Sequence, residues 1–390
     1  QELSLDAVSA PEAERLRSRL LDRSPVAVPA TAGPYEDAAK DSAEDPAMDG
    51  AGAAGAPGAV ELARISWAWL RFAPLTVFGV VAVGALAGTV WQLLEQFGMS
   101  PTDLPAVRAA ADWVVRSPTW LAIVAPVAAL VVIGTVGALV LYLEAWWRYR
   151  LTRHPDGTLQ VNRGLLTRRS VSIEERRVRG VTVNEPLLLR AGGGASCDAV
   201  ATGSGGGRAH LLPPAPTGHA HQVAAAVLRE ADPPTLVPLR RHPAAALRRR
   251  HIRAVLPALV LVAALAVIST AGAWLPGWLW LIVAALLLPL AVLLGADRYR
   301  GLGHAGTAGQ LVMREGSIAR QTVALQLEGV IGWRIEQSIF QRRAGLATVT
   351  ATTAAGSGAY RILDVELAQG LRTADAATPG LLAPFLRREP

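Results

Sequence analysis

Arginine side chains supply most of the chemistry that this sequence offers. Of 38 basic residues, Lys40 is the single lysine, so nearly all of the positive charge is guanidinium, which stays protonated and can bind phosphate with two hydrogen bonds. The first arginine group follows an uncharged run that is long enough to cross a bilayer. Its members are Arg163, Arg168, Arg169, Arg176, Arg177 and Arg179. Beside a bilayer such residues attract anionic lipid at about 1 kcal/mol each. We predict that this group binds lipid headgroups, and the alternative is general positive charge on one face of a membrane.

A second arginine group directly precedes another long uncharged run. Its members are Arg240, Arg241, Arg248, Arg249, Arg250 and Arg253. Basic residues at this position fix the orientation of membrane helices. We therefore interpret the second group as membrane-interface residues that determine topology, rather than as a binding site.

The remaining sequence contains no catalytic or metal-binding set. Gly301, Gly303 and Gly306 match a dinucleotide-binding pattern, but they follow an apolar run instead of a strand. The single cysteine, Cys197, rules out a thiolate metal cluster and an intrachain disulfide. Aromatic side chains for base stacking are scarce outside the apolar runs, which argues against nucleic-acid binding. The sequence thus predicts a protein that is not an enzyme and has no catalytic residue, metal or cofactor.

Long uncharged runs determine the class of protein. The chain is 51% hydrophobic and only 18% charged, whereas soluble domains carry about 25% charged residues. A helix needs about 20 residues to cross a bilayer. The sequence predicts four membrane spans in two hairpins, at about residues 73–94, 118–143, 254–275 and 278–296.

The distribution of arginine predicts the orientation of these spans. Basic residues flank the outer ends of both hairpins, as at Arg150 and Arg300, while the loop inside the second hairpin has no charge. Positive residues stay on the cytoplasmic side. We expect a multi-pass protein of the cytoplasmic (plasma) membrane, with both termini and the region between the hairpins in the cytoplasm.

The chain contains an internal repeat. At an offset of 152 residues, the segment 171–197 aligns without a gap with the segment 323–349, and the two glycines Gly180 and Gly332 coincide. Each copy directly follows a predicted hairpin. Both contain short runs rich in β-branched residues, separated by glycines, and both end in a helical stretch. Each copy is therefore predicted to be an antiparallel β-domain closed by a C-terminal helix.

The repeated segments LQVNRGLLTRRSVSIEERRVRGVTVNEPLLLRAGG and LVMREGSIARQTVALQLEGVIGWRIEQSIFQRRAGLATV, each after a hairpin and an Arg-Tyr-Arg tripeptide, resemble a known family. The chain is similar to membrane-flanked bacterial pleckstrin-homology-like (bPH2) proteins of the YdbT type, over about residues 62–390. The resemblance implies a seven-stranded PH-like barrel with one capping helix for each copy. Members often have three such domains, so residues 1–24 are expected to be the last strand and capping helix of a preceding, truncated domain.

The predicted fold class is an α+β membrane protein, in which two transmembrane hairpins alternate with cytoplasmic PH-like domains. Residues 25–61, rich in Ala, Pro, Gly and acids, are expected to form a disordered linker. The predicted units are the preceding domain end 1–24, the linker 25–61, hairpin one 62–147, a PH-like domain 148–238, hairpin two 239–297 and a PH-like domain 298–390.

Two functions agree with this architecture. The first is a non-enzymatic scaffold or binding module for proteins or anionic lipid at the inner membrane surface, with envelope maintenance or stress resistance as a context. The expected partners are anionic membrane lipids and unidentified proteins, including other copies of the chain, because small β-domains offer strand edges for pairing. The alternative is a lipid-handling or lipid-transfer protein, which requires an apolar cavity in a PH-like domain.

Overall fold

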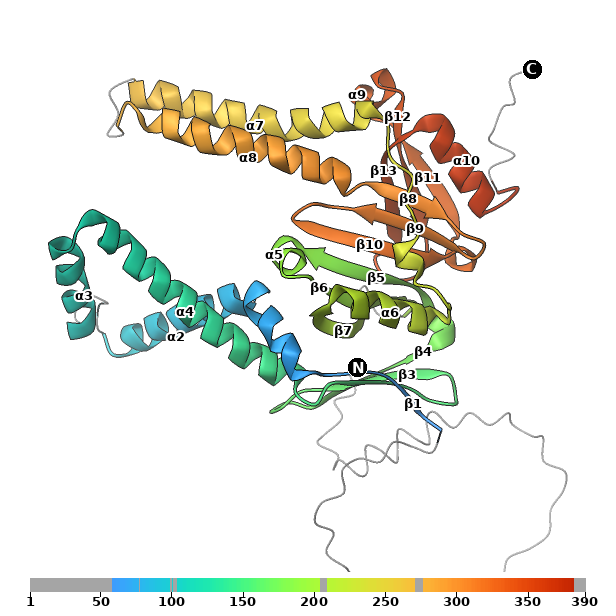
Figure 1. Ribbon diagram of the computed structural model, residues 1–390, viewed down its shortest axis with the longest axis horizontal. Coiled ribbons are helices and arrows are strands. Elements are labelled where there is room, and N and C mark those ends of the chain that lie inside the picture. The colour runs from blue at the N-terminus through green and yellow to red at the C-terminus, as the bar shows by residue number, and fades with distance from the viewer. Residues whose placement is uncertain are drawn as a thin grey trace, which may run out of the picture. The chain divides into compact units, whose positions relative to one another are not determined.

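Two helical regions alternate with two strand-rich copies in the computed structural model (Figure 1). The structure describes residues 58–76, 78–98, 100, 104–203, 209–270 and 276–381. The domain end predicted for residues 1–24 and the predicted linker up to residue 57 lie outside the described residues.

The first helical region contains a short 3-10 helix and three α-helices. They are η1 (Trp67–Leu75), α2 (Phe78–Gln96), α3 (Pro105–Arg116) and α4 (Thr119–Trp146). The second region is a pair of long helices, α7 (Ala244–Thr270) and α8 (Leu279–Arg300). The start of α7 lies ten residues before the uncharged run, so four arginines of the second group lie on the helix itself.

Three helices in the described residues, α4, α7 and α8, are long and apolar enough to cross a membrane. The prediction of four spans is therefore corrected to three. The first expected span does not form one helix, because its first residues, Ala73 to Leu75, belong to η1, and Ala73 is buried in the core of the first copy. The rest of that span forms α2, which has 19 residues and ends at Glu95 and Gln96.

The first copy is built from six strands and the helix α6, with an added strand from before the helices. These elements are β2 (Arg150–Arg153), β3 (Thr158–Arg163), β4 (Arg169–Glu174), η3 (Glu175–Arg177), β5 (Val178–Pro186), α5 (Leu187–Ala191), β6 (Gly194–Ala201), β7 (Ala209–Pro216), α6 (Thr217–Leu228) and η4 (Pro234–Leu236). The added strand β1 (Val60–Arg64) pairs antiparallel with β2, so the last two residues of the predicted linker are part of a sheet.

The second copy repeats this order. Its elements are β8 (Gly303–Gly306), β9 (Gln310–Glu315), β10 (Ala319–Gln326), η5 (Leu327–Gly329), β11 (Gly332–Glu336), α9 (Ile339–Arg343), β12 (Leu346–Thr352), β13 (Ala359–Glu366) and α10 (Leu367–Ala377). The first copy thus ends in α6 and the second in α10. The helical stretch expected for the second copy, at residues 380–387, follows α10 and lies mostly outside the described residues.

The strands form three sheets, and the middle sheet contains strands of both copies. Their orders are β1-β2-β3-β4, β7-β6-β5-β10-β9-β8 and β11-β12-β13. Strand β5 of the first copy pairs antiparallel with β10 of the second, with Glu185 opposite Arg320. The closed seven-stranded barrel implied by the resemblance is therefore not the arrangement of the described strands. Each copy has six strands of its own, and a shared sheet joins the two copies.

Two apolar cores stabilise these sheets. The core of the first copy includes Phe72 of η1 and Tyr142 of α4 together with residues of β2, β3, β5, β6, β7 and α6. The hydroxyl of Tyr149, directly after α4, donates to the carbonyl of Leu211 on β7. The second core joins residues of β9, β10, β12, β13 and α10, and Val200 of the first copy. The helices are thus packed onto the strands and are not separate from them.

The turn that links β3 to β4 contains a glycine, Gly164, whose replacement should destabilise the chain. Gly164 has φ +109°, and a Cβ there would lie 2.0 Å from the carbonyl oxygen of Thr167. The change Gly164→Ala is therefore expected to lower the melting temperature of the full chain. Gly157→Ala is the matched control, because Gly157 also has a positive φ but no atom near its added Cβ. Left-handed backbone alone costs an alanine about 1–2 kcal/mol. Equal effects of the two changes would show that the turn is not tightly closed.

Candidate functional site

The turn between β3 and β4 lies against the end of α4. The amide of Gly164 donates to the carbonyl of Trp147, and the amide of Leu165 donates to the carbonyl of Glu144, each at 3.0 Å. The guanidinium of Arg163 lies 4.2 Å from the centre of the Trp146 ring. Burial lowers the pKa of Arg163 below its ordinary value. The turn is therefore fixed at the end of a helix of membrane-spanning length.

Apolar and basic side chains are exposed together on this turn. The exposed fractions are 47% for Leu165 and 85% for Leu166, and Arg168 and Arg169 are exposed beside them. The sequence analysis identified the arginines but missed the leucines. The available signal was the apolar pair Leu-Leu between a glycine and two arginines, within a turn where polar residues are usual.

The other residues of the first arginine group lie elsewhere. Arg176 and Arg177 follow β4 at its opposite end, and their Nε atoms lie 2.7 and 3.4 Å from the Glu174 carboxylate. Arg179 lies on β5, where its side chain covers Gly329. A strand of six residues spans about 20 Å. The structure thus brings Arg163, Arg168 and Arg169 together and separates them from the other three.

The residues of the second arginine group also fall into two sets, one exposed and one paired with a carboxylate. Arg240 and Arg241 are exposed in the segment before α7, and Arg248 is exposed on the helix. Arg249 and Arg250 instead face the second copy, where both pair with the carboxylate of Asp364 on β13. The Arg250 Nη2 to Asp364 Oδ2 distance is 2.6 Å. These two arginines therefore hold α7 against the strands, a role that the sequence analysis did not predict.

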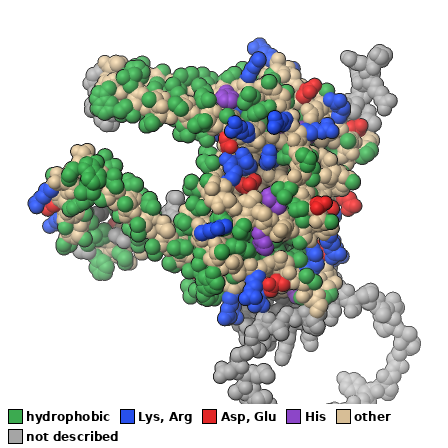
Figure 2. Space-filling model, viewed as in Figure 1, with side chains coloured by type: hydrophobic (Ala, Val, Ile, Leu, Met, Phe, Trp, Pro, Cys, Tyr) green, Lys and Arg blue, Asp and Glu red, His purple; other side chains and the backbone are tan. Residues whose placement is uncertain are grey.

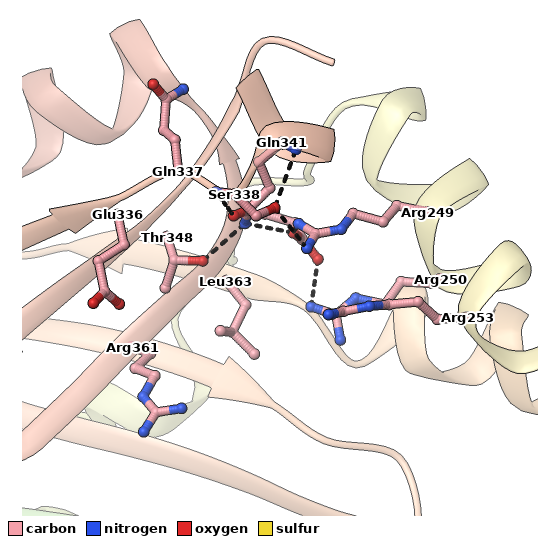
Figure 3. Close-up of a pocket in the computed structure, with 11 residues that line it drawn as sticks. Arg249, Arg250, Arg253, Glu336, Gln337, Ser338, Gln341, Thr348, Arg361 and Leu363 are labelled. Carbon is pink, nitrogen blue, oxygen red and sulfur yellow. Dashed lines mark hydrogen bonds and ion pairs between the residues drawn. The ribbon is translucent and has the colours of Figure 1, made fainter. Parts of the chain in front are cut away.

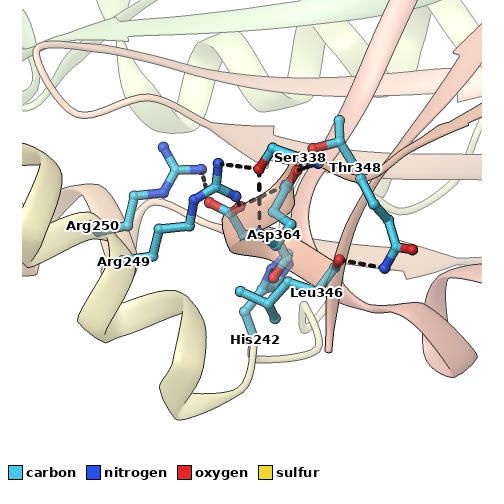
Figure 4. Close-up of polar contacts among 9 residues, drawn as sticks. His242, Arg249, Arg250, Ser338, Leu346, Thr348 and Asp364 are labelled. Carbon is cyan, nitrogen blue, oxygen red and sulfur yellow. Dashed lines mark hydrogen bonds and ion pairs between the residues drawn. The ribbon is translucent and has the colours of Figure 1, made fainter. Parts of the chain in front are cut away.

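Asp364 is the centre of a buried polar cluster. Its side chain is 2% exposed, and its Oδ1 also accepts a 2.9 Å hydrogen bond from Gln341 on α9. Ser338 caps α9 and accepts a 3.3 Å hydrogen bond from Arg249. Figure 4 shows Arg249 and Arg250 reaching Asp364 from the side of the helix while Ser338 lies across from them. The residues come from α7, α9 and β13, which only the folded chain brings together.

A cleft of about 700 Å³ lies beside this cluster, between α7 and the second copy. Figure 3 shows Arg249, Arg250 and Arg253 entering it from the helix, with Glu336 and Arg361 on the strand side. The rest of its lining is mainly polar, comprising Gln337, Ser338, Gln341, Thr348, Leu363 and Asp364. Figure 2 shows that hydrophobic side chains cover the helical regions, whereas basic side chains gather over the strands. The cleft is suited to an anionic group.

Two histidines lie behind the Asp364 cluster. His242 Nδ1 is 3.1 Å from the carbonyl oxygen of Asp364, so it donates to that oxygen, and His242 Nε2 can then accept from His304 Nδ1 at 3.3 Å. His304 Nε2 lies 3.4 Å from the amide nitrogen of Gln369, which can donate to it. These tautomers follow from the hydrogen-bond network. Burial, with the neighbouring His242 and Arg240, lowers the pKa of His304 to about 4. Both histidines are therefore neutral at pH 7.

A second acidic residue, Asp297 at the end of α8, connects that helix to both copies. It pairs with Arg190 of α5 at 3.0 Å and with Arg320 of β10 at 3.2 Å. Ser317 donates to it at 2.6 Å. The second helical pair is thus anchored at both helices, by Asp297 on α8 and by Asp364 against α7.

The comparisons with known proteins agree with the repeated architecture. The family described as Bacterial PH domain matches residues 100–231 and 252–375, once for each copy. No curated protein and no solved structure matched the chain. Each match includes the helix directly before a copy and all six strands of that copy. The two matches together cover more than half of the sequence, so the chain belongs to the bacterial PH domain family.

Proposed function

We propose that this chain is a non-enzymatic integral membrane protein whose PH-like domains act as binding modules for anionic lipid at the cytoplasmic membrane surface. The observation that carries this proposal is the β3–β4 turn, residues 164–169. It combines exposed Leu165 and Leu166 with exposed Arg168 and Arg169 at the end of α4. Under the predicted orientation, that end of α4 is the cytoplasmic one.

Both kinds of side chain favour contact with a bilayer. Fully burying a leucine side chain yields about 1.5–3 kcal/mol. An arginine near anionic lipid adds about 1 kcal/mol. Leu165 and Leu166 would enter the interfacial region while Arg168 and Arg169 meet phosphate groups. The alternative of lipid transfer requires an apolar cavity, and the cleft beside α7 is lined mainly by polar side chains.

A fluorescent probe on Leu166→Cys tests this contact in proteoliposomes of the full chain. The native Cys197 is fully buried, so an added cysteine can be labelled selectively. We expect nitroxide-bearing lipids to quench the probe strongly, because residue 166 lies in the interface. The measurement compares vesicles of zwitterionic lipid with vesicles that also contain phosphatidylglycerol, and quenching should be stronger in the anionic vesicles.

Two control proteins make the result specific. A probe on Pro155→Cys, in the exposed turn at the opposite end of β3, should be quenched weakly. Adding Arg168→Gln and Arg169→Gln to Leu166→Cys should remove the extra quenching that anionic lipid causes. Weak quenching at residue 166 in both lipid mixtures, equal to that at residue 155, would refute the proposal.

A further inference from the structure

The cleft between α7 and the second copy has unbalanced positive charge. Arg249 and Arg250 share the charge of Asp364, and Glu336 lies 3.3 Å from Arg334 in an exposed ion pair. In contrast, Arg253 and Arg361 line the cleft without an ion pair within the described residues. The carboxylate of Glu315 interacts with Arg361 at longer range, but Glu315 does not line the cleft.

Two hydroxyl groups that line the same cleft can donate hydrogen bonds. The hydroxyl of Ser338 accepts from the Gln341 amide, and the hydroxyl of Thr348 accepts from the Gln341 side chain, so each keeps its proton for a ligand. Phosphate oxygens only accept hydrogen bonds and pair with guanidinium groups through short, charge-assisted contacts. Two arginines that have no ion pair within the described residues, together with two hydroxyls, therefore match a doubly charged phosphate.

The position of the cleft indicates how such a ligand would arrive. Arg253 is the last charged residue before the uncharged run that begins at Ala254, on a helix long enough to cross a membrane. The cleft thus lies at the level where α7 changes from polar to apolar surroundings. Its volume of about 700 Å³ is typical of small-molecule sites, which range from about 300 to 1,000 Å³.

We infer that this cleft binds a phosphate monoester, with Arg253 and Arg361 as the residues that contact it. Ser338 and Thr348 donate hydrogen bonds to the remaining oxygens. A phosphomonoester lipid such as phosphatidic acid and a soluble phosphate share this chemistry. The site is separate from the β3–β4 turn, so it does not depend on the proposed contact of that turn with lipid.

The inference is tested with the full chain in detergent. Phosphatidic acid, glycerol 3-phosphate and inorganic phosphate are the probes, and phosphatidylglycerol, a singly charged diester, is the comparison lipid. Native mass spectrometry and the shift in melting temperature report binding. We expect the phosphomonoesters to bind at least about tenfold more tightly than phosphatidylglycerol, because only a phosphomonoester can carry two negative charges and so pair with both Arg253 and Arg361.

The variant Arg253→Gln with Arg361→Gln should lose this preference. Arg372→Gln, which removes an exposed arginine of α10, is the matched control and should retain it. Binding of phosphatidic acid alone identifies a lipid headgroup site, and binding of inorganic phosphate as well identifies a site for free phosphate. Equal binding of phosphatidic acid by the double variant and by the unchanged chain would overturn the inference. Leu165→Ser with Leu166→Ser should not affect this binding, which separates the inference from the proposed function.

Discussion

Replacing Asp364 with asparagine should destabilise the full chain by about 3–5 kcal/mol, because the change leaves two buried guanidinium groups without a counter-charge. The side chains of Arg249 and Arg250 are only 13% and 14% exposed. The backbone of Asp364 has φ +55°, a conformation that asparagine adopts readily, so the substitution removes charge without adding backbone strain. The melting temperature of the protein in detergent measures the effect.

Two further variants distinguish loss of the ion pairs from a general effect of mutation. Asp375→Asn removes an exposed carboxylate from α10 and should change the melting temperature little. Combining Asp364→Asn with Arg249→Met and Arg250→Met removes all three charges and keeps a residue that tolerates the positive φ, so it should recover much of the stability that Asp364→Asn alone loses. If Asp364→Asn were as mild as Asp375→Asn, the Asp364 cluster would not hold α7 to the second copy.

Acidification should also destabilise the protein, through His304. Its pKa is about 4 in the folded chain and about 6.5 when unfolded, so the unfolded chain binds more protons between these values. The contribution is complete above pH 6.5 and is lost as the pH falls toward about 4. Protonation of His304 at Nε2 would place this new N–H donor against the donating amide of Gln369. A loss on the order of 3 kcal/mol is expected, from the size of the pKa shift.

The variant His304→Gln isolates this effect, because glutamine fills the site without titrating in this range. Its melting temperature should fall less between pH 7 and pH 4.5 than that of the unchanged chain. Part of the pH dependence should remain, because burial also lowers the pKa of His242, which Asp364 and Arg250 surround. His154→Gln, at a half-buried position between β2 and β3, is the control substitution of a histidine outside this cluster. Identical pH profiles for His304→Gln and the unchanged chain would contradict this role.

Local and repeated features could be predicted from the sequence. The offset of 152 residues predicted two β-copies after two helical regions, and the glycines of that repeat mark equivalent turns. Gly164 and Gly316 both have positive φ, and at each of them an added Cβ would clash with the carbonyl oxygen of the residue three positions later. Three of the four expected spans correspond to helices that are long and apolar enough to cross a membrane, because a long uncharged run is a sufficient signal for such a helix.

Contacts between distant segments could not be predicted. Asp364 lies 115 residues from Arg249, and no local pattern relates a carboxylate on a strand to an arginine on a long apolar helix. From the sequence, the second arginine group therefore indicates only the membrane topology. The prediction of the first span was wrong for a similar reason, since Ala73 begins an uncharged run in the sequence but is buried in the core of the first copy. The β5–β10 pairing likewise depends on how the two copies meet.

Electron cryomicroscopy of the full chain in nanodiscs that contain phosphatidylglycerol would show whether the β3–β4 turn meets the bilayer. We predict that residues 164–169 contact the disc, with Leu166 inside the headgroup density and Arg168 and Arg169 at the level of the phosphates. A layer of solvent between this turn and the disc would contradict it.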